Sequence, residues 1–159
     1  MKSFTQSNWY NFYPKKSPDP TILIVDDLPS NLKVLRGLLK DSGYQLVFAN
    51  SGQQCLYRLQ KNRPDLILLD LMMPDMDGIE TCRRLKESQQ TADIPVIFLT
   101  ASNESENLVR AFELGAVDYV TKPFRTSELL ARISNHLKLA YLQQRTRQQA
   151  EQDKIVRYI

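Results

Sequence analysis

The segment LILLDLMMPDMDG at residues 66–78 joins a short, wholly apolar run to a polar loop. Residues 66–69 are apolar at every position, whereas a strand with one solvent-facing side alternates apolar and polar residues. Asp70 follows this run directly, and an apolar repeat at helical spacing begins at Ile79. The segment therefore predicts a strand that is buried on both faces, ends at a carboxylate and is followed by a helix.

The same alternation of apolar runs and helical repeats continues on both sides of this segment. The other predicted strands are ILIV at 22–25, LVFA at 46–49, VIFL at 96–99 and a short strand at Tyr119 and Val120. The other predicted helices centre on Leu35, Leu56 and Ala111, and the last one begins at about Thr126. Five predicted strands thus alternate with five predicted helices.

Apolar strands joined by helices are typical of a parallel sheet that is covered on both faces, because each crossover returns a helix across one face. We therefore expect a doubly wound three-layer α/β sandwich of the flavodoxin-like type. Its five-stranded parallel sheet should have the order 2-1-3-4-5, and its last helix should be unusually long.

The chain divides into three parts. Residues 1–20 contain three prolines and show no regular periodicity, which predicts an irregular arm; residues 21–137 form the predicted domain, and residues 138–159 a helical extension. The net charge of +3 comes from the two ends, since the domain has 13 basic against 15 acidic residues. A weakly basic extension is a poor nucleic-acid signal, so we expect no direct nucleic-acid binding.

The composition is that of an ordinary globular protein, with 42% hydrophobic and 25% charged residues in a chain of 159. No run approaches the 18 apolar residues of a membrane span, and the start lacks the pattern of a signal peptide. We expect a cytoplasmic protein without a membrane partner. The two cysteines, Cys55 and Cys82, lie in helical apolar patterns and are predicted to be buried thiols.

Polar side chains follow the predicted strands where they end. Asp26 and Asp27 follow the first strand and Asp70 follows the third, and these strands are neighbours at the switch point of the expected sheet. Three carboxylates would then crowd one pocket, which is tolerable only with a shared cation or proton. Thr100 ends the fourth strand and Lys122 follows the fifth, so a hydroxyl and an ammonium should reach the same edge.

Together these positions resemble the receiver domains of two-component response regulators. The resemblance runs from Thr21 to about Leu137, and the motifs that carry it are IVDD at 24–27, LLDLMMPDMDG at 68–78, FLTA at 98–101 and YVTKPF at 119–124. Any one of these motifs would be a weak signal. Five pocket residues in the right order on successive strand ends make a specific one.

The resemblance implies a phosphoacceptor site. Asp70 would accept a phosphoryl group from a sensor histidine kinase or a phosphotransfer protein, forming an aspartyl phosphate. Asp26 and Asp27, together with Asp70 and the backbone carbonyl of Met72, would hold Mg²⁺. Lys122 would neutralise charge on the transferred group, and its bond to the following proline resembles the cis peptide of the family.

The resemblance also implies a switch. Thr100 would donate a hydrogen bond to the bound phosphoryl group, and Tyr119 would move from an exposed to a buried position. This movement would reshape the surface formed by the helix around Ala111, the strand at Tyr119 and the helix from Thr126. A partner or a second copy of the chain would bind there, which predicts a homodimer.

Simpler interpretations and other functions have to be set against this one. Asp77 and Asp93 are expected to be solvated turn formers, and His136, on a polar stretch of the last helix, an inert exposed side chain. A phosphatase of the haloacid dehalogenase type would need a DxD pattern after the first strand, where this chain has adjacent aspartates. A flavodoxin-like electron carrier or a phosphorylation-independent receiver fits less well, and no turnover enzyme is expected.

The predicted last helix bears on the output. No Gly or Pro occurs from Thr126 to Ile159, and Leu130, Ile133, Leu137 and Ala140 form a heptad seam that becomes polar further on. Pairing of this helix with a second copy, or docking on a neighbour, is therefore expected. No helix-turn-helix module follows, and the apolar end IVRYI at 155–159 favours a receiver at the N-terminus of a larger regulator.

Overall fold

The computed structural model describes residues 19–101 and 105–157, in which five strands and five helices alternate. The predicted N-terminal arm lies almost entirely outside the described residues. The strands are β1 (Thr21–Val25), β2 (Gln45–Ala49), β3 (Leu66–Asp70), β4 (Val96–Thr100) and β5 (Asp118–Thr121). The helices are α2 (Pro29–Leu39), α3 (Gly52–Lys61), α4 (Gly78–Glu87), α5 (Ser105–Glu113) and α6 (Thr126–Arg157).

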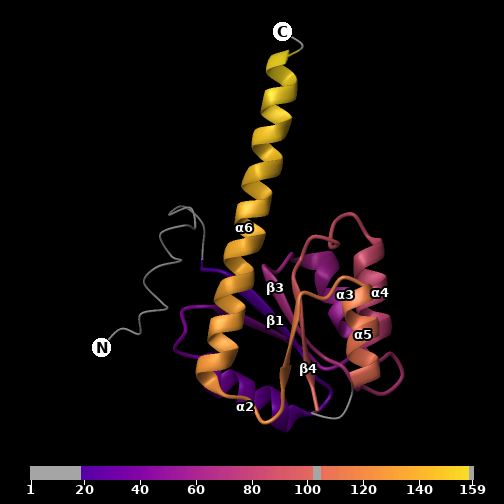
Figure 1. Cartoon of the computed structure of the whole chain (residues 1–159). Coiled ribbons are helices and arrows are strands. Elements are labelled where there is room, and N and C mark those ends of the chain that lie inside the picture. The colour runs from indigo at the N-terminus through magenta and orange to yellow at the C-terminus, as the bar shows by residue number, and fades with distance from the viewer. Residues whose placement is uncertain (1–18, 102–104, 158–159) are drawn as a thin grey trace.

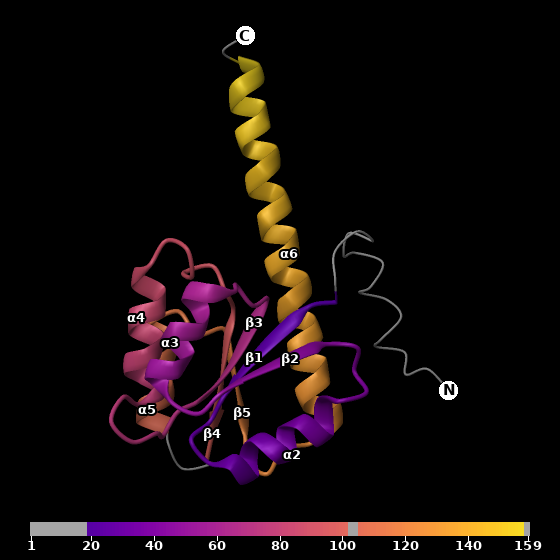
Figure 2. The same ribbon diagram turned by 180° about the vertical axis from the view of Figure 1, so that it is seen from behind.

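The strands form one parallel sheet in the order β2-β1-β3-β4-β5, which confirms the predicted order. Helices α2 and α6 cover one face of the sheet, and α3, α4 and α5 cover the other (Figures 1 and 2). The predicted three-layer sandwich is therefore correct. All five strands point the same way, so their carboxyl ends share one edge of the sheet.

Alternate residues of the strands feed two separate cores. In β1, Leu23 and Val25 belong to the core under α3, α4 and α5, whereas Ile22 and Ile24 belong to the core under α2 and α6. This is the period-2 geometry of a strand with both faces buried. Cys55 and Cys82 lie in the first core as free, buried thiols, as predicted.

Helix α6 is 32 residues long and has two unlike halves. In its first half, Leu129, Ile133 and Leu137 are buried in the core under α2 and α6, and Leu130 packs against that core. From Leu142 to Ile155 every residue is exposed, and this half projects from the domain (Figures 1 and 2). The predicted dimer seam is thus largely occupied within the chain, because the same apolar stripe packs on the sheet.

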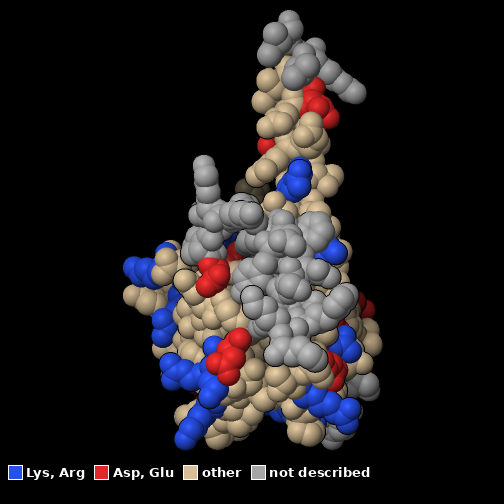
Figure 3. All heavy atoms as spheres, turned by 90° about the vertical axis from the view of Figure 1, so that its left-hand side faces the viewer, with Lys and Arg blue, Asp and Glu red and all other residues tan. Residues whose placement is uncertain are grey.

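None of the helices in the described residues is long and apolar enough to cross a membrane. On the face seen in Figure 3, Lys and Arg side chains lie in separate groups among acidic and uncharged ones.

Candidate functional site

Three carboxylates meet at the carboxyl edge of the sheet. Asp26 comes directly after β1, and Asp70 is the last residue of β3, which pairs with β1 in parallel. Asp26 is completely buried and Asp70 is 4% exposed, whereas Asp27 is partly exposed. One carboxylate oxygen from each of the three lies within 4.8 Å of the other two. The structure thus brings together the acidic residues that the sequence predicted would meet.

Hydrogen bonds from the start of α2 hold the Asp26 carboxylate in place. The backbone N–H of Leu28 donates to Oδ1 at 3.0 Å, and the side-chain amide of Asn31 donates to Oδ2 at 3.1 Å. The Leu28 N–H is available because it precedes the first helical turn and has no partner within the helix. These donors offset part of the cost of burying a charged group.

Lys122 reaches the carboxylates from the end of β5. Its Nζ lies 3.3 Å from Oδ1 of Asp70 and 3.8 Å from Oδ2 of Asp26. The backbone N–H of Lys122 donates to the carbonyl of Thr100 at 2.8 Å, which continues the pairing of β4 and β5 past their ends. The Lys122–Pro123 peptide bond is cis. One ammonium therefore faces two buried carboxylates.

Thr100 occupies the last position of β4 and is 1% exposed. Its hydroxyl donates to the carbonyl of Ala101 at 3.0 Å. In the sheet, Thr100 pairs with Thr121, the residue just before Lys122, and Asp70 pairs with Leu99. The two pairings place the hydroxyl, the ammonium and the Asp70 carboxylate at one edge, as the sequence predicted.

Burial dominates the electrostatics of Asp70. Removal from water raises the pKa of this carboxyl, and the neighbouring charge of Asp26 raises it further. The Lys122 ammonium and the backbone N–H of Met72 act in the opposite direction, and the resulting pKa is about 7. The site therefore contains more negative charge than its single lysine balances.

The loop from Leu71 to Asp77 fixes the backbone around Asp70 through a close contact with Gly78. A Cβ at Gly78 would lie 2.3 Å from the Asp70 carbonyl oxygen and 2.9 Å from the Leu71 Cα. The Gly78 N–H donates to the Leu71 carbonyl at 3.0 Å, and the Asp77 carboxylate caps α4 by accepting the N–H of Glu80 at 2.8 Å. Sequence reasoning did not predict this role for Gly78, although a glycine at the start of a helix was a signal.

The methionines of this loop differ from one another. Met73 and Met76 are buried. The Met72 side chain is 60% exposed, so only its backbone faces the site, where its N–H binds Asp70.

The donor set fits a small, hard divalent cation. Carboxylate and backbone carbonyl oxygens are the ligands that Mg²⁺ prefers, and the three acidic residues can each offer one oxygen to the same point. No histidine or cysteine takes part in this cluster of described residues, which argues against a zinc site.

The match to a protein family agrees with this geometry. The family described as the response regulator receiver domain matches residues 22–134. The chain belongs to this family. It is a receiver domain of the kind found in two-component response regulators.

Relatives of this receiver domain include transcriptional regulators. The phosphate regulon transcriptional regulatory protein PhoB of Pseudomonas aeruginosa is 46% identical over 113 residues, which cover 71% of this chain and 49% of that protein. The DNA-binding dual master transcriptional regulator RpaA of Synechocystis is 44% identical over 117 residues, covering 72% of this chain and 47% of that protein. The receiver spans about half the length of these relatives. The expectation that it does not bind nucleic acid itself stays a prediction.

Solved structures agree with the fold. The chemotaxis protein CheY4 of Vibrio cholerae has a TM-score of 0.70 at 30% identity, and the match covers 74% of this chain and 98% of that one. The signal receiver domain of a signal transduction histidine kinase from Syntrophus aciditrophicus has a TM-score of 0.69 at 38% identity, covering 74% of this chain and 89% of that one.

An exposed apolar patch lies on α5 and β5 of the receiver domain. Tyr119 is 37% exposed, and its ring contacts the edge of Phe112 at a centroid distance of 6.0 Å and an interplanar angle of 74°. Phe112, Val109 and Val117 are also exposed large apolar side chains. The aromatic side chain predicted to switch thus begins at the surface.

The prediction for His136 was wrong. Its side chain is only 13% exposed, and its Nε2 lies 3.0 Å from Oδ2 of Asp118. Arg132 contacts the same carboxylate. The error arose because Asp118 lies on a strand 18 residues earlier, so no local sequence pattern reveals the contact.

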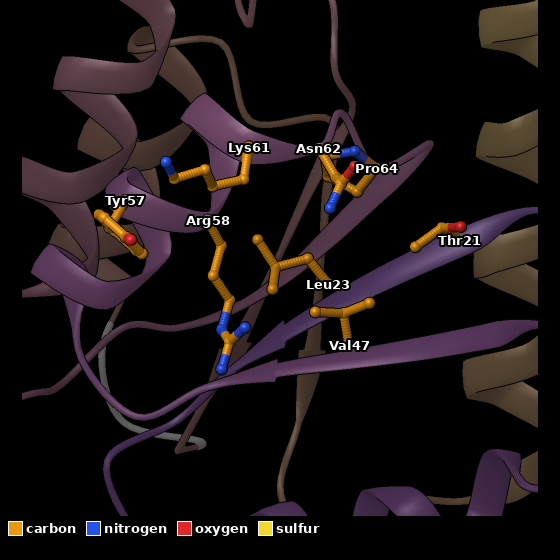
Figure 4. A pocket seen from close by; sticks show the side chains of 8 residues that line it. All are labelled: Thr21, Leu23, Val47, Tyr57, Arg58, Lys61, Asn62 and Pro64. Atoms are coloured by element: carbon orange, nitrogen blue, oxygen red, sulfur yellow. The ribbon is translucent and has the colours of Figure 1, made fainter.

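A small groove lies beside strands β1 and β2 (Figure 4). It is lined by the start of β1 at Thr21, by Val47 of β2 and by the last turns of α3, including Tyr57, Arg58 and Lys61. Its volume of about 90 Å³ is small, and the lining contains no carboxylate. The groove therefore offers no carboxylate ligand for a cation.

Proposed function

We propose that Asp70 accepts a phosphoryl group from the phosphohistidine of a sensor histidine kinase or phosphotransfer protein. An oxygen of the Asp70 carboxylate attacks phosphorus; the new P–O bond forms as the P–N bond breaks, and the leaving imidazole takes a proton from solvent. The observation that carries this proposal is the position of Asp70, within 4.8 Å of Asp26 and Asp27 and 3.3 Å from Lys122.

Asp26, Asp27 and Asp70, with the backbone carbonyl of Met72, would hold Mg²⁺. When bound, the metal supplies positive charge that neutralises the transferring phosphoryl group. Lys122 contributes a second positive charge, fixed by its contacts with Asp70 and Asp26. The chain acts on its own aspartate and does not turn over an external substrate.

The state of Asp70 is passed to the surface by Thr100 and Tyr119. The buried Thr100 hydroxyl lies at the end of β4, where it donates to a phosphoryl oxygen in place of the Ala101 carbonyl. Its shift opens space for the exposed Tyr119 ring to turn inward, away from Phe112. The patch on α5 and β5 then has a different shape in the two states.

That patch and the projecting half of α6 would bind a second copy or an attached effector. Val109 and Phe112 on α5, and Leu142 and Ile155 on α6, are exposed apolar side chains. Val109→Lys and, separately, Leu142→Lys with Ile155→Lys should lower the phosphorylation-dependent mass measured by light scattering. Unaltered mass in both variants would exclude homodimerisation through these surfaces.

The chemistry is tested with acetyl phosphate and Mg²⁺. The parent should gain one acid-stable, base-labile phosphoryl group, located on Asp70 by peptide mass spectrometry. Asp70→Asn should not be labelled, because the amide is not a nucleophile. The matched control is Asp75→Asn, an exposed residue of the same loop, which should be labelled like the parent. Equal labelling of the parent and Asp70→Asn would refute the assignment.

A further inference from the structure

The Asp118 carboxylate joins the first residue of β5 to α6. Nη1 of Arg132 lies 2.8 Å from both carboxylate oxygens, and Nε2 of His136 lies 3.0 Å from Oδ2. Arg132 and His136 are one helical turn apart and therefore face the same side of α6. The backbone N–H of Tyr119 donates to Oδ1 of the same carboxylate at 2.8 Å. The Asp118 side chain thus bonds both to its own strand, β5, and to α6.

The contact of Asp118 is better shielded than the ion pair between Arg147 of α6 and Asp93. The side chains of Asp118, His136 and Arg132 are 16%, 13% and 40% exposed, whereas those of Arg147 and Asp93 are 60% and 44% exposed. Burial by itself would raise the pKa of Asp118, but the hydrogen bonds from Arg132, Tyr119 and His136 outweigh it and lower the pKa. Shielded, multiply bonded carboxylates hold their partners more firmly than exposed ion pairs do.

Strand β5 connects this contact directly to the phosphoacceptor site. The strand has four residues, with Asp118 at its start and Lys122 immediately after its end. Lys122 contacts Asp70 at 3.3 Å, and Tyr119, the proposed switch residue, is the neighbour that donates to Asp118. A change in β5 at either residue therefore reaches Asp118 through a few peptide units.

The geometry of α6 makes a small change at Asp118 large at its far end. From His136 to Arg157 the helix extends about 32 Å, so a rotation of about 10° at the contact displaces the end by about 6 Å. The projecting half stands clear of the domain (Figure 1), and no packed neighbour in the described part of the chain opposes that displacement beyond Arg147.

We propose that Asp118 is a positioning residue that couples β5 to α6, so that the state of Asp70 sets the direction of the projecting half of α6. This inference rests on the proposed phosphorylation of Asp70. It assigns a role to Asp118, Arg132 and His136 outside the phosphoacceptor site. Loss of the Asp118 carboxylate should leave phosphorylation of Asp70 intact but abolish its effect on the direction of α6.

The test measures the distance from α3 to the end of α6 in the full chain by electron–electron resonance between spin labels. The labels are placed on Gln60→Cys and Gln152→Cys, both exposed positions. The native thiols should stay unlabelled, because burial raises the pKa of Cys55 to about 12 and of Cys82 to about 11. Labelled protein is diluted into unlabelled protein, so that only distances within one chain are measured.

The parent should show a shift of several ångströms when acetyl phosphate and Mg²⁺ are added. Asp118→Asn should abolish this shift and broaden the distribution of distances, while Asp70 is phosphorylated to the same extent as in the parent. The matched control is Asp93→Asn, the same substitution at the exposed pair with Arg147, and it should behave like the parent. Arg132→Lys, which keeps the charge, should retain part of the shift. If Asp118→Asn does not fold, Arg132→Gln with His136→Gln replaces it, since this variant preserves the contact with Tyr119.

The inference would be overturned if Asp118→Asn retained the shift, or if the phosphorylated parent showed no shift. A parent that acetyl phosphate does not phosphorylate would instead contradict the proposed function. In that case the unphosphorylated samples still test whether Asp118 positions α6. If Asp118→Asn does not broaden the distribution of distances, the positioning role of Asp118 is overturned.

Discussion

The two edges of the sheet use the same residue types in opposite ways. At the carboxyl edge, Asp26 and Asp70 are buried beside one another with a single lysine between them. At the amino edge, where the strands begin, Asp118 and Asp93 each pair with an arginine of α6. These two carboxylates are matched by cations of the chain itself, so they hold structure. Those at the carboxyl edge are in excess, so they are available to bind something else.

The magnitudes agree with this distinction. Two charges about 4.8 Å apart at an effective dielectric of about 20 repel by about 3 kcal/mol, whereas an exposed ion pair contributes about 0.2–1 kcal/mol. Lys122 attracts Asp70 at 3.3 Å and Asp26 at 3.8 Å, so the distinguishing feature of the carboxyl edge is its charge count, three carboxylates against one ammonium. A site with this excess of negative charge gains stability from a bound cation or proton.

The largest difference in stability between the two edges is expected from replacing one glycine at each edge. Gly78→Ala should destabilise the fold by about 3 kcal/mol, because its Cβ would meet the Asp70 carbonyl oxygen at 2.3 Å. Gly115→Ala, at the amino edge, should cost about 1 kcal/mol, since only its φ of +104° is unfavourable. Urea unfolding measures both.

The control for this pair is Gly37→Ala on α2, where a Cβ meets nothing within 4 Å. It should stabilise the chain by up to about 1 kcal/mol through helix propensity. Gly78→Ala as stable as the parent would mean that the backbone of Asp70 can move, which would contradict a rigid carboxyl edge.

Mg²⁺ should stabilise the chain by binding at the carboxyl edge and not at the amino edge. At a concentration about ten times its dissociation constant, a ligand of the native state adds about 1.4 kcal/mol, or about 4 °C in melting temperature. Asp27→Ala should reduce this response, because it removes one of the three carboxylates. Asp93→Asn should leave it unchanged, and scanning calorimetry with and without Mg²⁺ compares them. A melting temperature that Mg²⁺ leaves unchanged in the parent would remove the metal site.

Asp118→Asn should destabilise the amino edge by about 1 kcal/mol at neutral pH. The folded pKa of Asp118 is lowered, so its contribution is complete above the unfolded pKa of about 3.9 and is lost as the pH falls through the folded pKa. The difference between the parent and the variant in urea unfolding should therefore shrink as the pH falls below about 3.9. A difference that stays the same at every pH at which both proteins fold would show that ionisation of Asp118 plays no part.

The smallest effect is expected for Arg147→Gln, at about 0.3 kcal/mol, because the pair with Asp93 is largely solvated. Its value should fall further in about 1 M salt, which screens exposed charges within about 3 Å. Urea unfolding at two salt concentrations measures it. A loss above about 1 kcal/mol would place this pair on a level with Asp118 and remove the contrast between them.

The sequence predicted the carboxyl edge because topology alone brings strand ends together. Once β1, β3, β4 and β5 are parallel and adjacent, Asp26, Asp70, Thr100 and Lys122 have to meet, whatever the details of packing. The contacts of Asp118 could not be predicted in this way. Arg132 and His136 are 14 and 18 residues away, and their approach depends on the rotation of α6 about its axis.

The stripe at Leu130, Ile133 and Leu137 teaches a related lesson. Its spacing correctly predicted an apolar helix face, but a stripe carries no information about what covers it. In the structure the sheet covers it. Gly78 was missed for a similar reason, since its close approach to Asp70 depends on how the loop between β3 and α4 folds back.

Helix α6 runs back along the sheet from the carboxyl edge and leaves the domain at the amino edge (Figures 1 and 2). A phosphodonor that reaches Asp70 therefore approaches one pole of the molecule, while whatever binds the projecting half of α6 occupies the other. The two need not compete for space. A molecule that binds the projecting half of α6 therefore leaves the approach to Asp70 open.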